Sequence, residues 1–521
     1  MKKFLPKLLI TIFFLSFIEI TASPSIILLP DEKNELSKSR QSQRNNQPSE
    51  INYSIEPFYD LNAFRLIVVL EFKGDKSGET KIVLPSSPDL SSVKYLKALS
   101  PNTYILDTDK PEYKIVKHPP GSSVQIYYQF EESRHGDLEL GNHYMAIVNR
   151  RYFHFLGETF FIVPAWDDNT ECSLKIMWNH LPTNWSLENS FGVNEKYQEF
   201  KLSLWKFRHS VFAGGDFKII QRFIGKDIIY IAMRGNWKFS EDQFCDLVRD
   251  IMIEERNFWN DHSTRYFLVN LLSISDGGDQ SGIVRDNVYS LFLSSDRIID
   301  IRMKRLLSHD IFHTWIGEKV QFADPEQLVY WFKEGFTDYY ADLILLRAKL
   351  ISLDEYVDQY NTILETYYTS PMRYEKNERL ISEFKSDKDL TRLPYQRGQI
   401  FAHNLNFVIL KNSSWKKTLD DLMRDLLSRC INESLIISNG SLSALIRFYA
   451  GDQILSEMMR TLNSGGVLKT IPEALGPCFK MEIDSRKRLI IFGEQYDIPS
   501  YKLKNENQQI DKSCLSWFGV D

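Results

Sequence analysis

The chain has 521 residues, of which 43% are hydrophobic and 25% are charged, and its formal net charge is −6 at neutral pH. This length exceeds what one hydrophobic core supports, so we expect about two to four domains with an ordinary globular composition. The small net charge gives no reason to expect nucleic acid as a partner.

The N-terminus has the features of an export signal. Basic residues at Lys2, Lys3 and Lys7 lie before or at the start of an apolar run at 8–20, and small residues follow at 21–23. The run has 13 residues, fewer than the roughly 20 that a membrane-spanning helix needs. We expect a cleaved signal peptide over 1–22 and no stable membrane span afterwards, so that the mature protein is periplasmic or secreted.

The next segments predict a linker and then a β-rich domain. Residues 23–50 are expected to be disordered, because 31–50 is almost entirely polar and cannot offset the entropy of ordering. Over 51–227, runs of β-branched and aromatic residues alternate with Gly, Pro, Asn and Asp, which favours a sandwich or a saddle-like sheet. The clearest runs are Phe64–Phe72, Thr80–Pro85, Ser123–Phe130, Tyr152–Pro164 and Ser173–Trp178.

The pattern becomes helical in the second half of the chain. A strand at Ile228–Gly235 opens a domain over 228–464, and a capping box at Ser240–Gln243 begins a helix that runs through Phe258. Further helices are expected over 298–315 and 328–350, with more up to residue 462. The fold class is therefore α+β. The C-terminal tail, 465–521, has short apolar runs and turns and is not assigned.

The cysteines do not indicate a metal site. Cys172, Cys245, Cys430, Cys478 and Cys514 are far apart and form no CxxC pair. Export permits disulfides, and Cys478 with Cys514 is a candidate bridge near the C-terminus.

A histidine pair and a later glutamate form the most informative pattern. His309 and His313 are four residues apart, so both imidazoles can reach one metal ion from a helix. Glu334 opens the next amphipathic helix and can supply a third, oxygen ligand, which leaves the fourth position for water as in catalytic zinc sites. Asp338 is spaced to accept a hydrogen bond from a ligand histidine. Each carboxylate alone is more commonly an ordinary surface residue and the histidine pair alone is a weak signal, but the combination predicts a zinc site.

These residues resemble a known family. HDIFHTW, which begins at His309, and WFKEGFTDYY, which ends at Tyr340, are similar to the HExxHxW and EGFTxYY motifs of the glycyl aminopeptidase family of gluzincin zinc metallopeptidases. The resemblance implies a thermolysin-like zincin domain with a helical lobe behind a β-rich domain, and a peptide or protein substrate. Pro394–Gly398 resembles the family's YxKG segment, which implies that Tyr395 donates a hydrogen bond to the oxyanion of the tetrahedral intermediate.

The first departure from the family is Asp310, which stands where the family has the Glu that acts as general base. Aspartate carries the same base on a side chain one methylene shorter, and a misplacement of about 1 Å can cost roughly 10²-fold in rate. Three interpretations stay open: a retuned enzyme, a slow enzyme, and a zinc-binding protein that no longer hydrolyses peptides.

The second departure lies upstream, where the family has a GGxEHRNS-type segment whose Glu binds the free amine of the substrate. Aligning Gly277 and Gly278 puts Gln280 at the Glu position, whereas aligning Gly282 puts Val284 there. The nearby carboxylates, Asp279 and Asp286, are the candidates to substitute for that Glu. We predict that Gly277, Gly278 and Gln280 contact the substrate. Because the carboxylate is missing in both alignments, an endopeptidase or a binding role gains weight over a strict aminopeptidase.

The preferred function is a zinc-dependent peptidase in which Asp310 takes a proton from the metal-bound water and Tyr395 donates to the oxyanion. The alternative is a catalytically weak or silent zincin homologue that binds a peptide or a partner protein. A third hypothesis is an exported scaffold without metal. Replacing Asp310 by Glu separates the first two, because a damaged enzyme gains activity and a site tuned around Asp loses it.

Overall fold

The computed structural model describes residues 49–60, 63–86, 89–131, 144–275, 280–384, 386–487, 495–504 and 512–520. The signal peptide expected over 1–22 and most of the linker expected over 23–50 lie outside the described residues, so both stay predictions; the last two linker positions begin the first strand. Ser49–Asp521 forms one compact unit. Within its described part, no helix has both the length and the apolar character needed to cross a lipid bilayer.

The first part of this unit is built of β-sheets, as predicted. A six-stranded sheet has the order β14 (Tyr197–Ser203), β11 (Glu171–Trp178), β1 (Ser49–Tyr59), β2 (Phe64–Lys73), β7 (Ser123–Glu131) and β4 (Val93–Ala98). A four-stranded sheet has β10 (Val163–Pro164), β3 (Glu79–Val83), β6 (Tyr113–Lys117) and β5 (Tyr104–Asp107). A five-stranded sheet has β13 (Gly192–Val193), β12 (Ser186–Asn189), β15 (Val211–Gly215), β9 (Tyr152–Leu156) and β8 (Ile147–Val148). Every second side chain of β2 is buried, the period of a strand with one face on the core.

The prediction of a single strand over Tyr152–Pro164 is wrong. The chain forms β9, then the short helix α2 (Gly157–Phe160), and then β10 in a different sheet. The break falls at Gly157, whose backbone lies so close to the end of α3 (Leu204–Arg208) that a methyl group on it would be 2.3 Å from the Phe207 carbonyl oxygen. The apolar run continues through the break, so composition does not reveal it.

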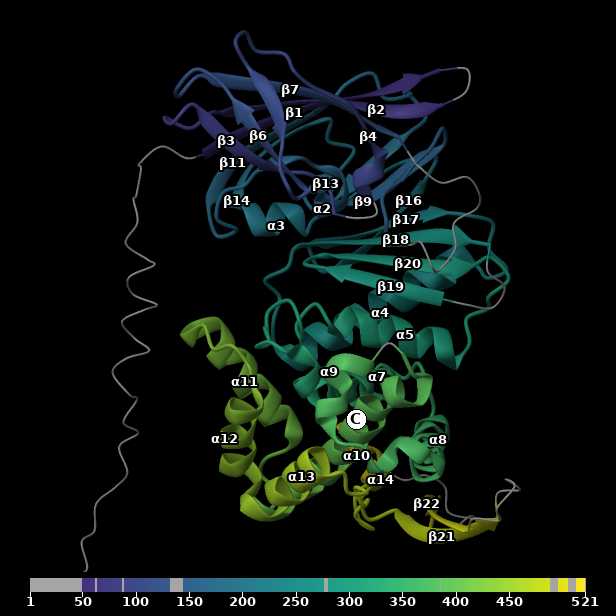
Figure 1. The fold of residues 1–521 in the computed structure, drawn as a ribbon. Helices are drawn as coiled ribbons and strands as arrows, with labels where there is room; N and C mark the ends of the chain where they lie inside the picture. Colours follow the sequence, from purple (N-terminus) through teal and green to yellow (C-terminus); the bar gives the residue numbers. More distant parts are fainter. Residues whose placement is uncertain are drawn as a thin grey trace, which may run out of the picture. The chain divides into compact units, whose positions relative to one another are not determined.

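A second five-stranded sheet lies beside the helices α4 (Glu241–Trp259) and α5 (Ile301–Phe312) (Figure 1). Its order is β16 (Lys218–Ile224), β17 (Asp227–Arg234), β18 (Tyr266–Ile274), β20 (Val288–Ser294) and β19 (Gln280–Arg285), with β17, β18 and β20 parallel and β19 at an edge. The domain boundary predicted between residues 227 and 228 falls inside this sheet, because β16 lies before it and pairs with β17. Helix α4 connects β17 to β18, and α5 follows β20.

The remainder of the unit is mostly helical. Its helices are α6 (Tyr330–Lys333), α7 (Gly335–Arg347), α8 (Leu353–Thr369), α9 (Leu380–Glu383), α10 (Lys388–Asn412), α11 (Leu419–Glu433), α12 (Asn439–Ala450) and α13 (Asp452–Ser464). Helix α7 packs against both α5 and α10, and these three helices share one apolar core with α4. The predicted α+β class is confirmed.

The ends of the predicted helices need correction. Ser240 caps α4 as expected, since its side chain accepts a hydrogen bond from the Gln243 amide. The helix predicted over 298–315 begins at Ile301, because Asp300 caps it, and ends at Phe312. The helix predicted over 328–350 is divided into a 3₁₀ turn (Glu326–Val329), α6 and α7, and Glu334 stands between the last two.

The C-terminal tail is ordered against the helices in its described part. It contains the hairpin of β21 (Phe479–Lys487) and β22 (Gln495–Leu503), followed by α14 (Lys512–Ser516). Cys478 and Cys514 form a disulfide, the bridge considered from the sequence. Asn361 of α8 exchanges two hydrogen bonds with the backbone of Tyr501, so the hairpin is held on the helical part.

Candidate metal centre

Two helices, α5 and α7, bring the predicted ligands together. His309 lies in the last turn of α5, His313 follows its end, and Glu334 precedes the first residue of α7. One nitrogen of each histidine and one oxygen of Glu334 all lie within 4.8 Å of one another. The side chains are only 12–17% exposed. The structure therefore groups the residues that the sequence pattern selected, from the end of α5 and the start of α7.

The hydrogen bonds of the histidines fix which nitrogen faces the cluster. His313 Nδ1 donates to the backbone oxygen of Ile316 and His309 Nδ1 donates to Asp338 Oδ1, both at 2.8 Å. The two Nε2 atoms are 3.0 Å apart, and each lies 3.4 Å from Glu334 Oε2. Zinc–nitrogen bonds of about 2.0–2.1 Å put tetrahedral ligand atoms about 3.4 Å apart. The three atoms thus fit one small cation, with Asp338 in the orienting position that we predicted.

The electrostatic environment of the cluster favours positive charge at its centre. Burial alone disfavours the charged form of both His309 and Glu334, but their close partners outweigh it. The pKa of His309 is raised well above its usual value by Asp338 and Glu334. The pKa of Glu334 is held well below its usual value by His313 and His309.

Asp310 lies beneath the edge strand β19 rather than among the ligands. A methyl group on Gly282 would be 2.2 Å from Asp310 Oδ2 and 2.5 Å from Tyr289 Cε2, so strand, carboxylate and ring are in direct contact. Burial raises the pKa of Asp310, and the charges of His309 and His313 counteract part of that effect. Sequence reasoning missed Tyr289, which comes from a buried strand with no motif around it.

Tyr395 lies beside the cluster on α10. Its ring is 6.0 Å from that of His309, centroid to centroid, and its hydroxyl interacts with the Glu334 carboxylate. Burial and the charges of Glu334 and Asp338 raise the pKa of Tyr395 well above its usual value. The hydroxyl therefore keeps its proton at neutral pH and is available as a hydrogen-bond donor.

A pair of glycines sets the distance between α10 and α7. A methyl group on Gly398 would lie 1.8 Å from the Trp331 carbonyl oxygen and 2.6 Å from Gly335 Cα. The two backbones are therefore in contact next to Glu334, and this contact carries Tyr395 toward the ligands. The sequence showed Gly398 only as the last residue of the YxKG-like segment, without this role.

The predicted substrate contacts are only partly described. Gly277 and Gly278 lie outside the described residues. Gln280 begins β19, and its side-chain oxygen accepts a hydrogen bond from Arg297 Nη2 at 2.9 Å, so it contacts an arginine rather than the ligand cluster. Within the described strand β19, no residue is a carboxylate.

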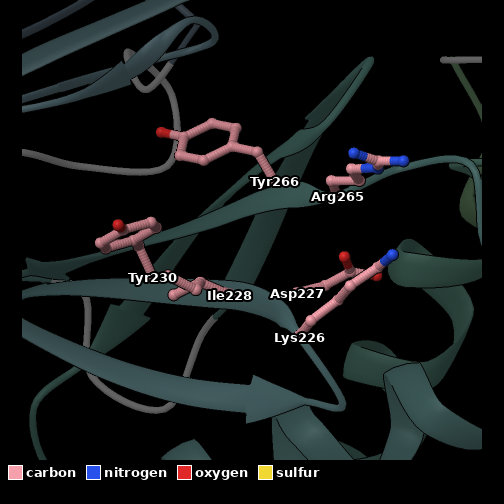
Figure 2. Close-up of a pocket in the computed structure, with 6 residues that line it drawn as sticks. All are labelled: Lys226, Asp227, Ile228, Tyr230, Arg265 and Tyr266. Carbon is pink, nitrogen blue, oxygen red and sulfur yellow. The ribbon is translucent and has the colours of Figure 1, made fainter.

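A separate pocket contains none of the predicted site residues. It measures about 310 Å³ and is lined by Lys226, Asp227, Ile228, Tyr230, Arg265 and Tyr266, where β17 and β18 begin (Figure 2). The two tyrosine rings lie on one side of it and the charged side chains on the other. Asp227 is paired with Arg256 at 3.1 Å, and we assign no chemistry to this pocket.

Comparison with known proteins supports the family suggested by the motifs. Residues 302–385, which contain His309, His313 and Glu334, match the family model of the M61 glycyl aminopeptidases. A sequence search of curated proteins gives no match.

The fold is shared with solved metallopeptidase structures. An aminopeptidase N family protein from Idiomarina loihiensis superposes with a TM-score of 0.69 at 15% identity, over 84% of this chain and 79% of the other. A two-domain M1 zinc metallopeptidase variant bound to L-arginine has a TM-score of 0.51 at 12% identity, over 81% and 95% of the two chains. At these identities the likeness shows the fold alone.

Proposed function

We propose that the chain is a zinc-dependent metallopeptidase that hydrolyses peptide bonds, as the match of residues 302–385 to the glycyl aminopeptidase family model supports. His309, His313 and Glu334 would hold the zinc ion. When bound there, zinc supplies a Lewis acid that lowers the pKa of a coordinated water and polarises the scissile carbonyl.

The convergence of three electron-pair donors carries this proposal. Nδ1 of each histidine is held by a fixed acceptor, so Nε2 is the nitrogen that faces the cluster and can supply a lone pair to a metal ion. The third atom is a carboxylate oxygen whose pKa is well below its usual value. Three such atoms within 3.0–3.4 Å of one another repel unless a cation or a proton lies between them.

The other residues have defined roles in this proposal. Asp310 is the base that receives the proton of the attacking water, from a carboxylate held between Gly282 and the end of α5. Tyr395 donates a hydrogen bond to the oxyanion, and its raised pKa keeps the donor protonated. Asp338 orients His309 through its Nδ1 proton.

The proposal is tested with the purified chain, zinc and a mixture of unstructured peptides analysed by mass spectrometry. We expect cleavage that a chelator stops and that added zinc restores. Peptides that stay intact under all zinc conditions would contradict the proposal.

We further propose that a free amino terminus is not required in the substrate. The described part of β19 has no carboxylate to bind an ammonium group, and Gln280 holds a cationic arginine there. We expect kcat/KM for a peptide and for its N-acetylated form to agree within about threefold, since no charge pair of roughly 1 kcal/mol or more is lost. A decrease of 100-fold on acetylation would instead indicate an aminopeptidase.

Removing the Tyr395 hydroxyl is predicted to slow hydrolysis without releasing zinc. Loss of one oxyanion donor costs about 10²–10³-fold in kcat, so Tyr395→Phe should lower kcat by that factor with KM and zinc content little changed. The control is Tyr356→Phe, because the Tyr356 hydroxyl is buried without a hydrogen-bond partner among the described residues. Equal kcat values for wild type and Tyr395→Phe would remove Tyr395 from the reaction.

The alternative is a zincin homologue that binds peptides and hydrolyses them weakly or not at all. The observation in its favour is the buried contact of the Asp310 carboxylate with Gly282 of β19. It predicts zinc and peptide binding without turnover. For either function we propose export through the N-terminal signal, which cell fractionation tests: a mature chain in the cytoplasm would contradict it.

A further inference from the structure

Glu334 lies at a junction that the local sequence alone does not hold in place. Helix α6 before it has only four residues, and Glu334 stands between α6 and α7 without a capping hydrogen bond from its side chain. A single helical turn is not stable by itself in water. The direction of the Glu334 side chain therefore depends on contacts that reach this segment from other parts of the fold.

The connection between α11 and α12 provides one set of these contacts. The Ala323 amide donates to the carbonyl oxygen of Ile437 at 2.9 Å, and the Ile437 amide donates to the carbonyl oxygen of Gln321 at 2.8 Å. Ile437 is fully buried, so its surroundings strengthen these two bonds. They tie the start of α12 to the chain that runs from His313 to Glu334.

Asn439, the first residue of α12, extends this connection to α6. Its Oδ1 accepts a hydrogen bond from Trp331 Nε1 at 3.0 Å, and its Nδ2 donates to the Leu328 carbonyl oxygen at 3.1 Å. Asn377 Nδ2 gives the same Leu328 oxygen a second hydrogen bond, at 2.7 Å. An indole N–H can only donate and a carbonyl oxygen can only accept. An asparagine satisfies both with one side chain, whereas an alanine would leave the buried indole N–H without a partner.

Trp331 transmits this contact to Glu334. The residue is 1% exposed, and its ring packs on that of Phe336 in α7 with 5.8 Å between the centroids. Its carbonyl oxygen lies against the backbone of Gly398. Because Glu334 follows three residues later, directly after the same turn, a shift of Trp331 also moves Glu334. Ligand distances in a metal site hold to within about 0.2 Å, so a small shift is enough to weaken the site.

We propose that Asn439 is a positioning residue of the metal centre: through Trp331 it fixes α6, and α6 holds Glu334 beside the two histidines. The start of α12 thereby sets the distance between the oxygen ligand and the two nitrogen ligands. This inference rests on the proposed function, since it takes the cluster to be a zinc site.

A purely structural role is the competing explanation, and α8 offers a matched control. Asn361 also bonds at both ends of its side-chain amide, since Nδ2 donates to the Tyr501 carbonyl oxygen at 2.9 Å and Oδ1 accepts from the Tyr501 amide at 2.7 Å. These two residues join α8 to β22, and neither element carries a ligand of the cluster. If Asn439 only held parts of the fold together, losing either asparagine would have the same consequences.

The experiment compares the full-length variants Asn439→Ala, Trp331→Phe, their double variant and Asn361→Ala. It measures the zinc dissociation constant by competition with a fluorescent chelator, and the melting temperature of the metal-free chain. Because loss of a group that orients a ligand weakens metal binding about 10–100-fold, we expect about tenfold weaker binding for Asn439→Ala and about threefold for Trp331→Phe. The double variant should bind about tenfold rather than about thirtyfold more weakly, since both changes remove the same bond and their effects do not add.

The visible spectrum of the cobalt(II)-loaded chain, which follows the coordination geometry, is the second measurement. At saturating cobalt it should differ from the wild-type spectrum in Asn439→Ala. Asn361→Ala should lower the melting temperature and keep the wild-type spectrum and zinc affinity.

Unchanged zinc affinity and an unchanged cobalt spectrum in Asn439→Ala overturn the inference alone, as do additive losses in the double variant or equal weakening in Asn361→Ala. If Asn439→Ala does not fold, wild-type zinc affinity in Trp331→Phe overturns it. A wild-type chain that binds no zinc overturns the proposed function and this inference with it.

Discussion

Asp310→Asn is expected to reduce kcat about 10²–10⁴-fold while zinc stays bound. This factor is the usual contribution of a positioned general base, and the amide of Asn occupies the same volume but cannot accept the proton. Asp310 is not among the three grouped ligand residues, so the cluster should survive the change. Steady-state hydrolysis and metal analysis of the same preparation measure both quantities.

The companion variant Asp310→Glu distinguishes a tuned site from a damaged one. The Asp310 carboxylate already touches Gly282 and lies beside the Tyr289 ring, so an additional methylene has to push β19 or turn the carboxylate away. We therefore expect Asp310→Glu to lose activity, by roughly 10²-fold for a displacement of about 1 Å. An increase in activity would mean that the short side chain is a defect. Activity of Asp310→Asn within a few-fold of wild type would place the base elsewhere.

Gly398→Ala is expected to destabilise the helical part and to weaken zinc binding together. The added methyl group would lie 1.8 Å from the Trp331 carbonyl oxygen and 2.6 Å from Gly335 Cα, and neither backbone atom can rotate away. Overpacking of this kind costs about 1–3 kcal/mol, more than the roughly 1 kcal/mol that alanine gains over glycine inside a helix. Separation of α10 from α7 also displaces Tyr395 from Glu334. Thermal unfolding and zinc affinity report the two effects.

Gly440→Ala is the matched control for this prediction. Gly440 is also helical, at the start of α12, and a methyl group on it would meet only Ser438 Oγ, at 3.5 Å. Its melting temperature should equal or exceed that of the wild type. A Gly398→Ala protein as stable as Gly440→Ala, with normal zinc affinity, would show that the close helix contact does not support the site.

The sequence was sufficient for the features that depend on local spacing. The four-residue interval of His309 and His313, and of Glu334 and Asp338, predicts which side chains share a helix face, and the structure groups these residues. The alternation of buried and less buried side chains along β2, and the helix cap at Ser240, also depend only on neighbouring residues. The α+β class follows from the change of period along the chain.

The features that the sequence did not reveal depend on contacts between distant residues. No proline marks the break between α6 and α7. The break occurs where the backbone of Gly335 contacts that of Gly398, which lies 63 positions later in the sequence. The strand predicted through Gly157 breaks where α3 approaches that glycine. The contact of Asp310 with Gly282 and the hydrogen bond of Trp331 with Asn439 likewise join separate elements.

The zinc site is tested most directly by the zinc content of the purified mature chain, measured beside its His313→Ala variant. We expect about one zinc per wild-type chain and a large loss in the variant, because the two remaining ligands do not complete a catalytic zinc site. The zinc site would be wrong if the wild-type chain held no zinc after the metal is supplied, or if the variant retained the full amount.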